Sequence, residues 1–206
     1  APGPDHDGER GPASIPLGSL GTAWPRASRA RTLDDVHRVL ARSAWGDTGG
    51  DDRATVLLGL RAAWYRRLVR QAPITTDWAH GAAAVLVARE RFVFERPIPE
   101  IPTHTLDQLL GRTWHDASTV PDLVDRLPAS AAWPFRHGPT SLWSAELAIV
   151  RRATAEATHV IDSGRAGRNT VSAVMALLLL NLRRVHAAIE AAGRLPLPAE
   201  VFDDVA

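Results

Sequence analysis

The stretch that decides the fold occurs twice in this chain. Residues 24–45 have the sequence WPRASRARTLDDVHRVLARSAW, and residues 114–133 have the sequence WHDASTVPDLVDRLPASAAW. Each copy begins and ends with tryptophan, and in each copy a threonine is followed within three residues by aspartate. The two copies start about 90 residues apart, which predicts two similar supersecondary units laid side by side.

The repetition continues beyond these stretches. Both copies lead into a helical stretch with a double arginine, then into an alanine-rich apolar helix, and each closes on a Pro-x-Pro turn at residues 97–99 or 196–198. We therefore expect an all-α protein in which two similar three-helix modules, residues 20–100 and 101–206, form one helical domain. Residues 1–19 are rich in Pro, Gly and acidic residues, so they are expected to form a disordered arm.

Capping residues and apolar periodicity give the bounds of the expected helices. Thr32 is suited to cap a short helix, because a threonine oxygen accepts a hydrogen bond from a free backbone N–H of the first turn. Pro73 ends a long helix, and Gly164 and Gly167 separate the last two. No stretch alternates with period two, so no sheet is expected. The expected helices cover residues 33–43, 53–71, 76–97, a linker within 102–112, 120–130, 140–160 and 169–192.

The composition argues against several classes of protein. A formal net charge of +1 argues against a dedicated nucleic-acid binder, and the absence of lysine among 24 basic residues points to a high-GC genome. Without cysteine there is neither a disulfide framework nor a thiolate metal site. The apolar run at residues 171–182 is shorter than the ~20 residues of a bilayer-spanning helix. It is expected to be a buried core helix in a cytoplasmic protein that does not insert into a membrane.

The candidate site residues are polar groups on helices. His186 and Glu190 lie four residues apart on one helix face, an arrangement that suits either a structural contact or a polar pocket. No further ligands at matching spacing accompany them, so neither a metal nor a cofactor is expected. The absence of a phosphate loop and of a G-x-S-x-G elbow leaves no catalytic residue assigned.

Two larger sets of residues have alternative interpretations. The double arginines could line a concave surface that attracts an acidic partner or an anionic ligand, or they could form a solvated face. The tryptophans at the ends of the repeat could line a ligand pocket, but their register favours the core. The arginine pairs lie at residues 66–67, 151–152 and 183–184, and the tryptophans are Trp24, Trp45, Trp114 and Trp133.

The sequence from Trp114 to Trp133 resembles the opening element of a known family, the central-stalk socket subunits of rotary V-type and A-type ATPases. Asn181-Leu182-Arg183, followed by Glu190 and the turn at residues 196–198, resembles the closing element. That family has three helical modules around a funnel that sits on the membrane rotor ring and receives the axle subunit. The resemblance covers about residues 20–206, with two modules in place of three.

This resemblance implies a shortened relative, a non-catalytic assembly or adaptor subunit that acts by protein–protein interaction. Its partners would be components of a membrane-associated complex, at whose periphery it would lie, or a second copy of itself. The alternative is a small all-α enzyme or ligand-binding protein with a polar pocket between the modules, lined by Arg183, His186, Glu190 and tryptophan. The residues expected to bind a partner are Arg151, Arg152, Asn181, Arg183 and Arg184.

Overall fold

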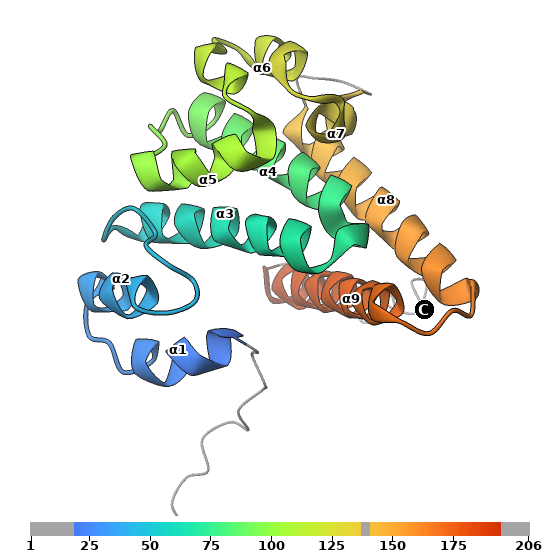
Figure 1. The fold of residues 1–206 in the computed structure, drawn as a ribbon, viewed down its shortest axis with the longest axis horizontal. Helices are drawn as coiled ribbons and strands as arrows, with labels where there is room; N and C mark the ends of the chain where they lie inside the picture. The colour runs from blue at the N-terminus through green and yellow to red at the C-terminus, as the bar shows by residue number, and fades with distance from the viewer. Residues whose placement is uncertain (1–18, 137–140, 195–206) are drawn as a thin grey trace, which may run out of the picture. The chain divides into compact units, whose positions relative to one another are not determined.

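The computed structural model describes residues 19–136 and 141–194, and all regular elements in these ranges are helices (Figure 1). The prediction of an all-α fold is confirmed. The expected arm at residues 1–19 lies outside the described residues apart from Ser19, and so does the expected closing turn at residues 196–198.

The chain divides into two compact units, residues 1–60 and 61–206. Helix α3, Arg53–Gln71, begins in the first unit and ends in the second. The module boundary predicted near residue 100 corresponds to the start of α5, which lies inside the second unit. The duplication of a three-helix module stays a prediction.

The first unit holds α1, Ser19–Ala27, packed against α2, Leu33–Ala41. Thr32 caps α2 as predicted, with its hydroxyl oxygen accepting from the Asp35 N–H at 3.1 Å. Trp24 was expected in the core, but the structure corrects this: 52% of its surface is exposed. Successive residues of a helix point about 100° apart, and the neighbouring Ala23 is buried.

A loop follows α2 and lies against the start of α3. Trp45 and Thr48 of this loop are buried, and the ring of His37 meets the carboxylate of Asp47 at 2.7 Å. A Cβ at Gly59 would lie 2.4 Å from the carbonyl oxygen of Thr48. Only glycine therefore lets the loop lie this close to α3.

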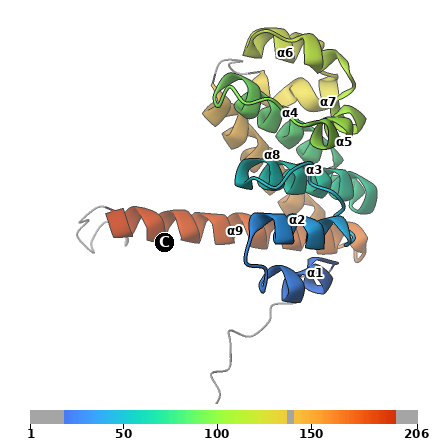
Figure 2. The same ribbon diagram turned by 90° about the vertical axis from the view of Figure 1, so that its left-hand side faces the viewer.

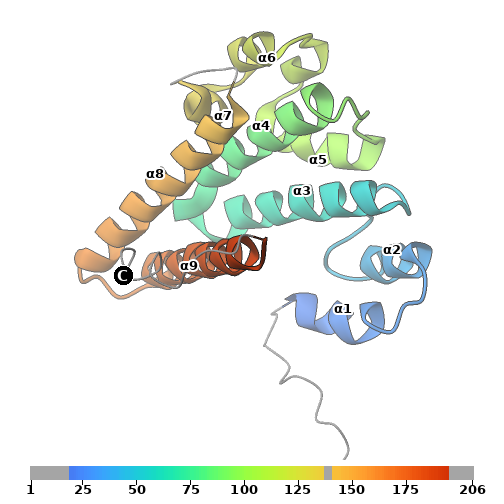
Figure 3. The same cartoon turned by 180° about the vertical axis from the view of Figure 1, so that it is seen from behind.

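The second unit is built around helix α4, Thr76–Phe92, none of whose residues is exposed. In Figures 1 and 3 it runs through the middle of the unit among α5, α7 and α8. Its alanines, together with the fully buried Leu106, Leu110, Leu123 and Phe135, form the main core. The surrounding elements are α5 Glu100–Leu110, α6 Val120–Arg126, α7 Ala129–Ala132, α8 Leu142–Asp162, α9 Arg168–Arg194 and the short 3₁₀ turns Pro73–Thr75, Thr113–Asp116 and Trp133–Phe135.

Three of the predicted helix bounds differ clearly from those observed, and two of these differences lie at a proline. The helix expected over 120–130 divides into α6 and α7, because Pro128 disfavours helical geometry at Leu127, whose ψ is 148°. Helix α4 ends at Phe92 rather than near Pro97. The linker helix α5 starts at Glu100, directly after Pro99, rather than at Thr103 or Thr105.

Helices α8 and α9 form a long antiparallel pair joined by a turn in which Gly164 has a φ of 65°. One face of α9 packs on α8 through Ala173, Ala176, Leu177 and Leu180. The expectation that residues 171–182 form a buried core helix is wrong, because Val171, Met175, Leu178 and Leu182 are each at least half exposed. Figure 2 shows the last turns of α9 extending beyond the other helices of the second unit.

Trp133 is buried against α4, as predicted, together with Trp45 and Trp114 in their own surroundings. Its indole N–H donates to the carbonyl oxygen of Asp77 at 3.2 Å, and the guanidinium of Arg152 lies 4.5 Å from the ring centroid. A Cβ at Gly81 would lie 3.1 Å from the indole ring, so α4 comes as close to Trp133 as glycine allows.

We expect Trp133→Ala to lower the free energy of unfolding by about 3 to 5 kcal/mol, because it removes a buried aromatic side chain and leaves a cavity. Chemical denaturation followed by circular dichroism measures this change. Trp143→Ala is the matched control, since Trp143 is 73% exposed and its loss should change the stability by no more than about 0.5 kcal/mol. Equal stability of the two variants would show that Trp133 does not pack as described.

Candidate functional site

A cavity of about 270 Å³ opens between four helices of the second unit. Its walls are apolar where they come from Val85 and Leu86 of α4 and from Ile149 and Val150 of α8. Charged side chains surround its mouth. These are Arg61 of α3, Arg89 of α4, Glu146 of α8 and Arg183 of α9, with the phenol of Tyr65 among them.

Three guanidinium groups and one carboxylate therefore line this cavity. Glu146, whose side chain is only 19% exposed, pairs with Arg89 and lies 3.8 Å from Arg183. Arg61 has no ion pair within the described residues. The lining carries three positive charges and one negative charge, an excess of two positive charges at neutral pH.

Tyr65 is the one tyrosine of the chain and lies with these arginines. Burial raises the pKa of its phenol above the ordinary value of 10.0, although Arg61, Arg89 and Arg183 each act in the opposite direction by favouring the phenolate. The phenol therefore stays protonated at neutral pH. In this form it can donate a hydrogen bond to an acceptor in the cavity.

Arg152, one of the residues expected to bind a partner, is engaged inside the protein. Its guanidinium donates to Asp77 at 2.7 Å and to Glu156 at 2.6 Å, and it covers the ring of Trp133. Glu156 also accepts from the indole N–H of Trp78 at 2.6 Å. This arrangement joins α4 to α8, so the charge of Arg152 serves the fold.

The remaining residues expected to bind a partner or form a pocket do not converge on one site. Arg183 reaches the cavity beside Glu146, but His186 and Glu190 are exposed and have no hydrogen bond or ion pair to any described residue. The expected pocket of Arg183, His186 and Glu190 is therefore not assembled. Asn181, Arg151 and Arg184 are also exposed.

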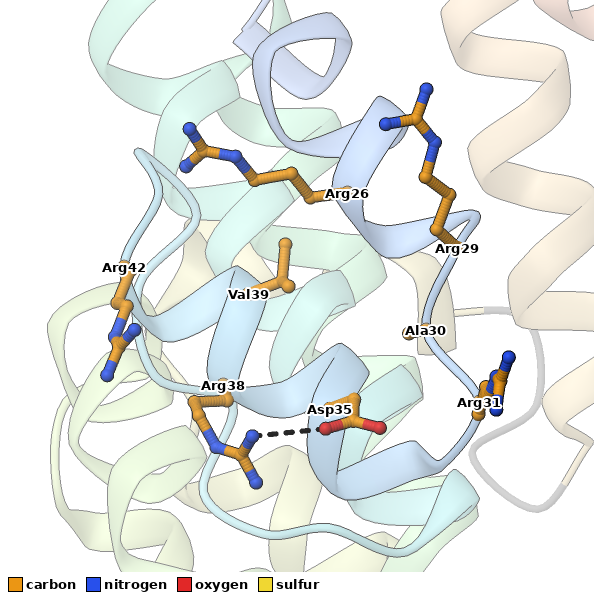
Figure 4. Close-up of a pocket in the computed structure, with 8 residues that line it drawn as sticks. All are labelled: Arg26, Arg29, Ala30, Arg31, Asp35, Arg38, Val39 and Arg42. Carbon is orange, nitrogen blue, oxygen red and sulfur yellow. Dashed lines mark hydrogen bonds and ion pairs between the residues drawn. The ribbon is translucent and has the colours of Figure 1, made fainter.

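A second cavity, of about 420 Å³, lies in the first unit between α1 and α2 (Figure 4). Arg26 and Arg42 lie on one side of it and Arg29 and Arg31 on the other, while Arg38 bonds to Asp35 at 3.0 Å. The guanidinium groups point in different directions around a floor that includes Val39. The guanidinium groups do not converge on one point. They form a solvated, positively charged rim around the cavity.

The sequence did not indicate either cavity. Arginines at 26, 29, 31, 38 and 42 lie close together in the sequence, but no two of them are adjacent. The cavity of the second unit is lined by residues between positions 61 and 183 that come from four helices. Its lining therefore depends on tertiary packing, and no local sequence pattern predicts it.

The outward face of α9 is an exposed apolar surface. Helix α9 is long and apolar enough over Arg168–Ala192 to cross a membrane by length and composition, and one such helix is weak evidence of a span. The side chains at this surface are between 41% and 65% exposed. They are Val171, Val174, Met175, Leu178, Leu179, Leu182, Val185 and Ile189.

Within the described ranges, no group of three or more His, Asp or Glu side chains is placed to hold a metal ion. Comparisons with protein-family models, with curated proteins and with solved structures find no match for this chain. The likeness to the ATPase socket subunits therefore rests on the sequence motifs alone.

We expect the phenol of Tyr65 to titrate above 10.0 in the folded protein. Because the chain has one tyrosine, the tyrosinate absorbance in an alkaline titration reports this group alone. A native pKa above the unfolded one means that the phenol contributes stability that is present below about pH 10 and is lost as pH rises through the native pKa. The urea-unfolded chain is the control, and a native midpoint at or below that of the control would contradict the burial of Tyr65.

Proposed function

We propose that this protein is an assembly protein whose α9 pairs with α9 of a second copy of the chain. The observation that carries the proposal is the exposed apolar face of α9. An apolar face of this length on a soluble helix is an interaction surface, since exposure of such a patch to water is unfavourable. The face opposite to it already packs on α8, so α9 would lie between its own unit and a partner.

The spacing of the apolar residues favours another helix as the partner. Along this face the residues follow one another in steps of four, three, four, three and four, which is the heptad pattern of paired helices. Each of them is at least half exposed. The six residues of this seam are Val171, Met175, Leu178, Leu182, Val185 and Ile189.

The positions beside the seam favour a second copy. In paired helices these flanking positions select the partner through their charges, and like charges there would oppose self-association. Here they carry no Asp, Glu or Arg. They hold Ser172, Leu179 and His186 on one side and Val174, Asn181 and Ala188 on the other. The same surface on two copies can therefore meet about a twofold axis without repulsion.

The charges of α9 disfavour a membrane span. Arg168 and Arg183 bracket an uncharged stretch of 14 residues, 169–182, whose helical length is about 21 Å. The hydrocarbon core of a bilayer is about 30 Å thick, so a span would bury arginine. A helix–helix interface leaves both arginines at the surface.

The expected association is moderate in strength. Full burial of one aliphatic side chain contributes about 1.5 to 3 kcal/mol. About half of the surface of each seam residue is already removed from water in a single copy. Each then contributes about 1 kcal/mol, so the seam residues of the two copies together contribute about 12 kcal/mol, which lies within the range of the association cost of about 4 to 15 kcal/mol. A dimer should therefore dissociate on dilution.

The socket-subunit role is a narrower form of this proposal. It adds that components of a rotary stalk or rotor ring are among the partners of the assembled protein. Its support is the likeness of residues 114–133 and 181–183 to the family motifs. Recovery of such components with the tagged protein from native lysate would favour it, and their absence would leave self-assembly alone.

We expect the wild-type protein to show a mass that rises from monomer to dimer with concentration, measured by sedimentation equilibrium. The double variant Leu178→Glu and Leu182→Glu should stay monomeric at every concentration, because it places charge in the middle of the seam. Val93→Glu is the matched control, since Val93 is 58% exposed and lies outside α9. It should dimerise like the wild type.

A wild-type protein that is monomeric at the highest concentration would contradict the proposal. So would a double variant that dimerises as the wild type does. If the monomeric wild type binds lipid vesicles and the double variant does not, the face binds a lipid surface instead. The helical spectrum of each variant, measured by circular dichroism, checks that the substitutions leave the fold intact.

A further inference from the structure

We propose that the cavity formed by α3, α4, α8 and α9 binds a small dianionic phosphate, either inorganic phosphate or the phosphate group of a small metabolite. The site is independent of the seam on α9. It joins Arg61, Arg89 and Arg183 with Tyr65 around one acidic residue, Glu146.

The charge of the cavity matches a dianion. Three guanidinium groups and one carboxylate leave an excess of two positive charges, and a phosphate carries about 1.5 to 2 negative charges at neutral pH. Guanidinium groups present two parallel N–H donors that fit phosphate oxygens, and such bonds are stronger than those between neutral groups. An acidic partner protein would supply single charges at wider spacing and would not fill this cavity.

The pairing within the cavity gives its arginines different roles. Glu146 holds Arg89 by an ion pair and lies 3.8 Å from Arg183, so it fixes Arg89 and draws Arg183 toward the cavity. Arg61 has no ion pair to the described residues and is available to a ligand. Glu146 thereby positions two cations that would otherwise repel each other.

The apolar wall strengthens these charges. Val85 and Leu86 are buried, and with Ile149 and Val150 they keep water from one side of the cavity. Electrostatic attraction is larger where water is excluded. The protonated phenol of Tyr65 adds a neutral donor, which contributes a hydrogen bond without changing the charge balance.

The volume limits the ligand. A cavity of about 270 Å³ lies below the range of roughly 300 to 1,000 Å³ that drug-sized ligands occupy. It accommodates a phosphate group with a short organic substituent. A nucleotide or a longer polyanion would extend into the solvent and gain little from the apolar wall.

The test is isothermal titration of the full chain with inorganic phosphate and with methyl phosphate, at constant ionic strength held with sodium chloride. The proposal expects saturable binding of both at one site. Arg61→Gln should weaken binding about tenfold or more, because it removes a charge-assisted hydrogen bond. Arg70→Gln is the matched control, since Arg70 is an exposed arginine of the same helix outside the cavity, and it should bind as the wild type does.

Tyr65 supplies a readout located in the site. A bound dianion disfavours the phenolate, so saturating phosphate should move the tyrosinate titration to higher pH, whereas sodium chloride at equal ionic strength should not. Absence of saturable binding would overturn the proposal. Equal affinity of the Arg61→Gln and Arg70→Gln variants would also overturn it, because phosphate would then bind elsewhere on this arginine-rich surface.

Discussion

The second unit depends on the burial of α4, none of whose residues is exposed. A helix without an exposed face must be covered on every side, and the small alanine side chains of α4 allow other helices to approach closely. Polar groups at its ends fix the covering elements: Arg91 donates to the carbonyl oxygens of Trp114 and Ala117 at 2.6 and 2.7 Å, and Asp77 holds Arg152 of α8. The arginine cavity results from the same arrangement, because α3, α8 and α9 meet beside α4.

The sequence predicts the helices well because their signals are local. Thr32 and Thr119 are followed by aspartates, and in the structure both cap a helix by accepting an N–H from the third residue along. The bounds of α3 agree with the prediction at both ends, where Arg53 and Gln71 are flanked by acidic residues and by Pro73. Prediction fails at Leu127 because the restriction that Pro128 places on it outweighs the apolar periodicity.

The sequence could not predict which face of each helix is buried and which is exposed. Residues 171–182 are apolar all round, a pattern that is equally typical of a buried helix and of one that leaves a face for a partner. Packing on α8 uses one face alone, and the neighbouring face stays open. The cavity was out of reach for a related reason. Arg61, Glu146 and Arg183 are separated by long stretches of chain, and only the crossing of four helices brings them together.

The second half of α9 has a consequence for dynamics. From Asn181 onward every described side chain of the helix is exposed, so no tertiary contact comparable to Ala173 and Leu180 supports its last turns. Isolated helices shorter than about 12 to 15 residues are marginally stable in water, even when they are as rich in alanine as residues 187–192. The amides of this half should exchange with solvent deuterium far faster than those of the first half. Association through this half would then order the helix as well as bury its apolar side chains. Part of the interaction free energy would be spent on suppressing helix fraying.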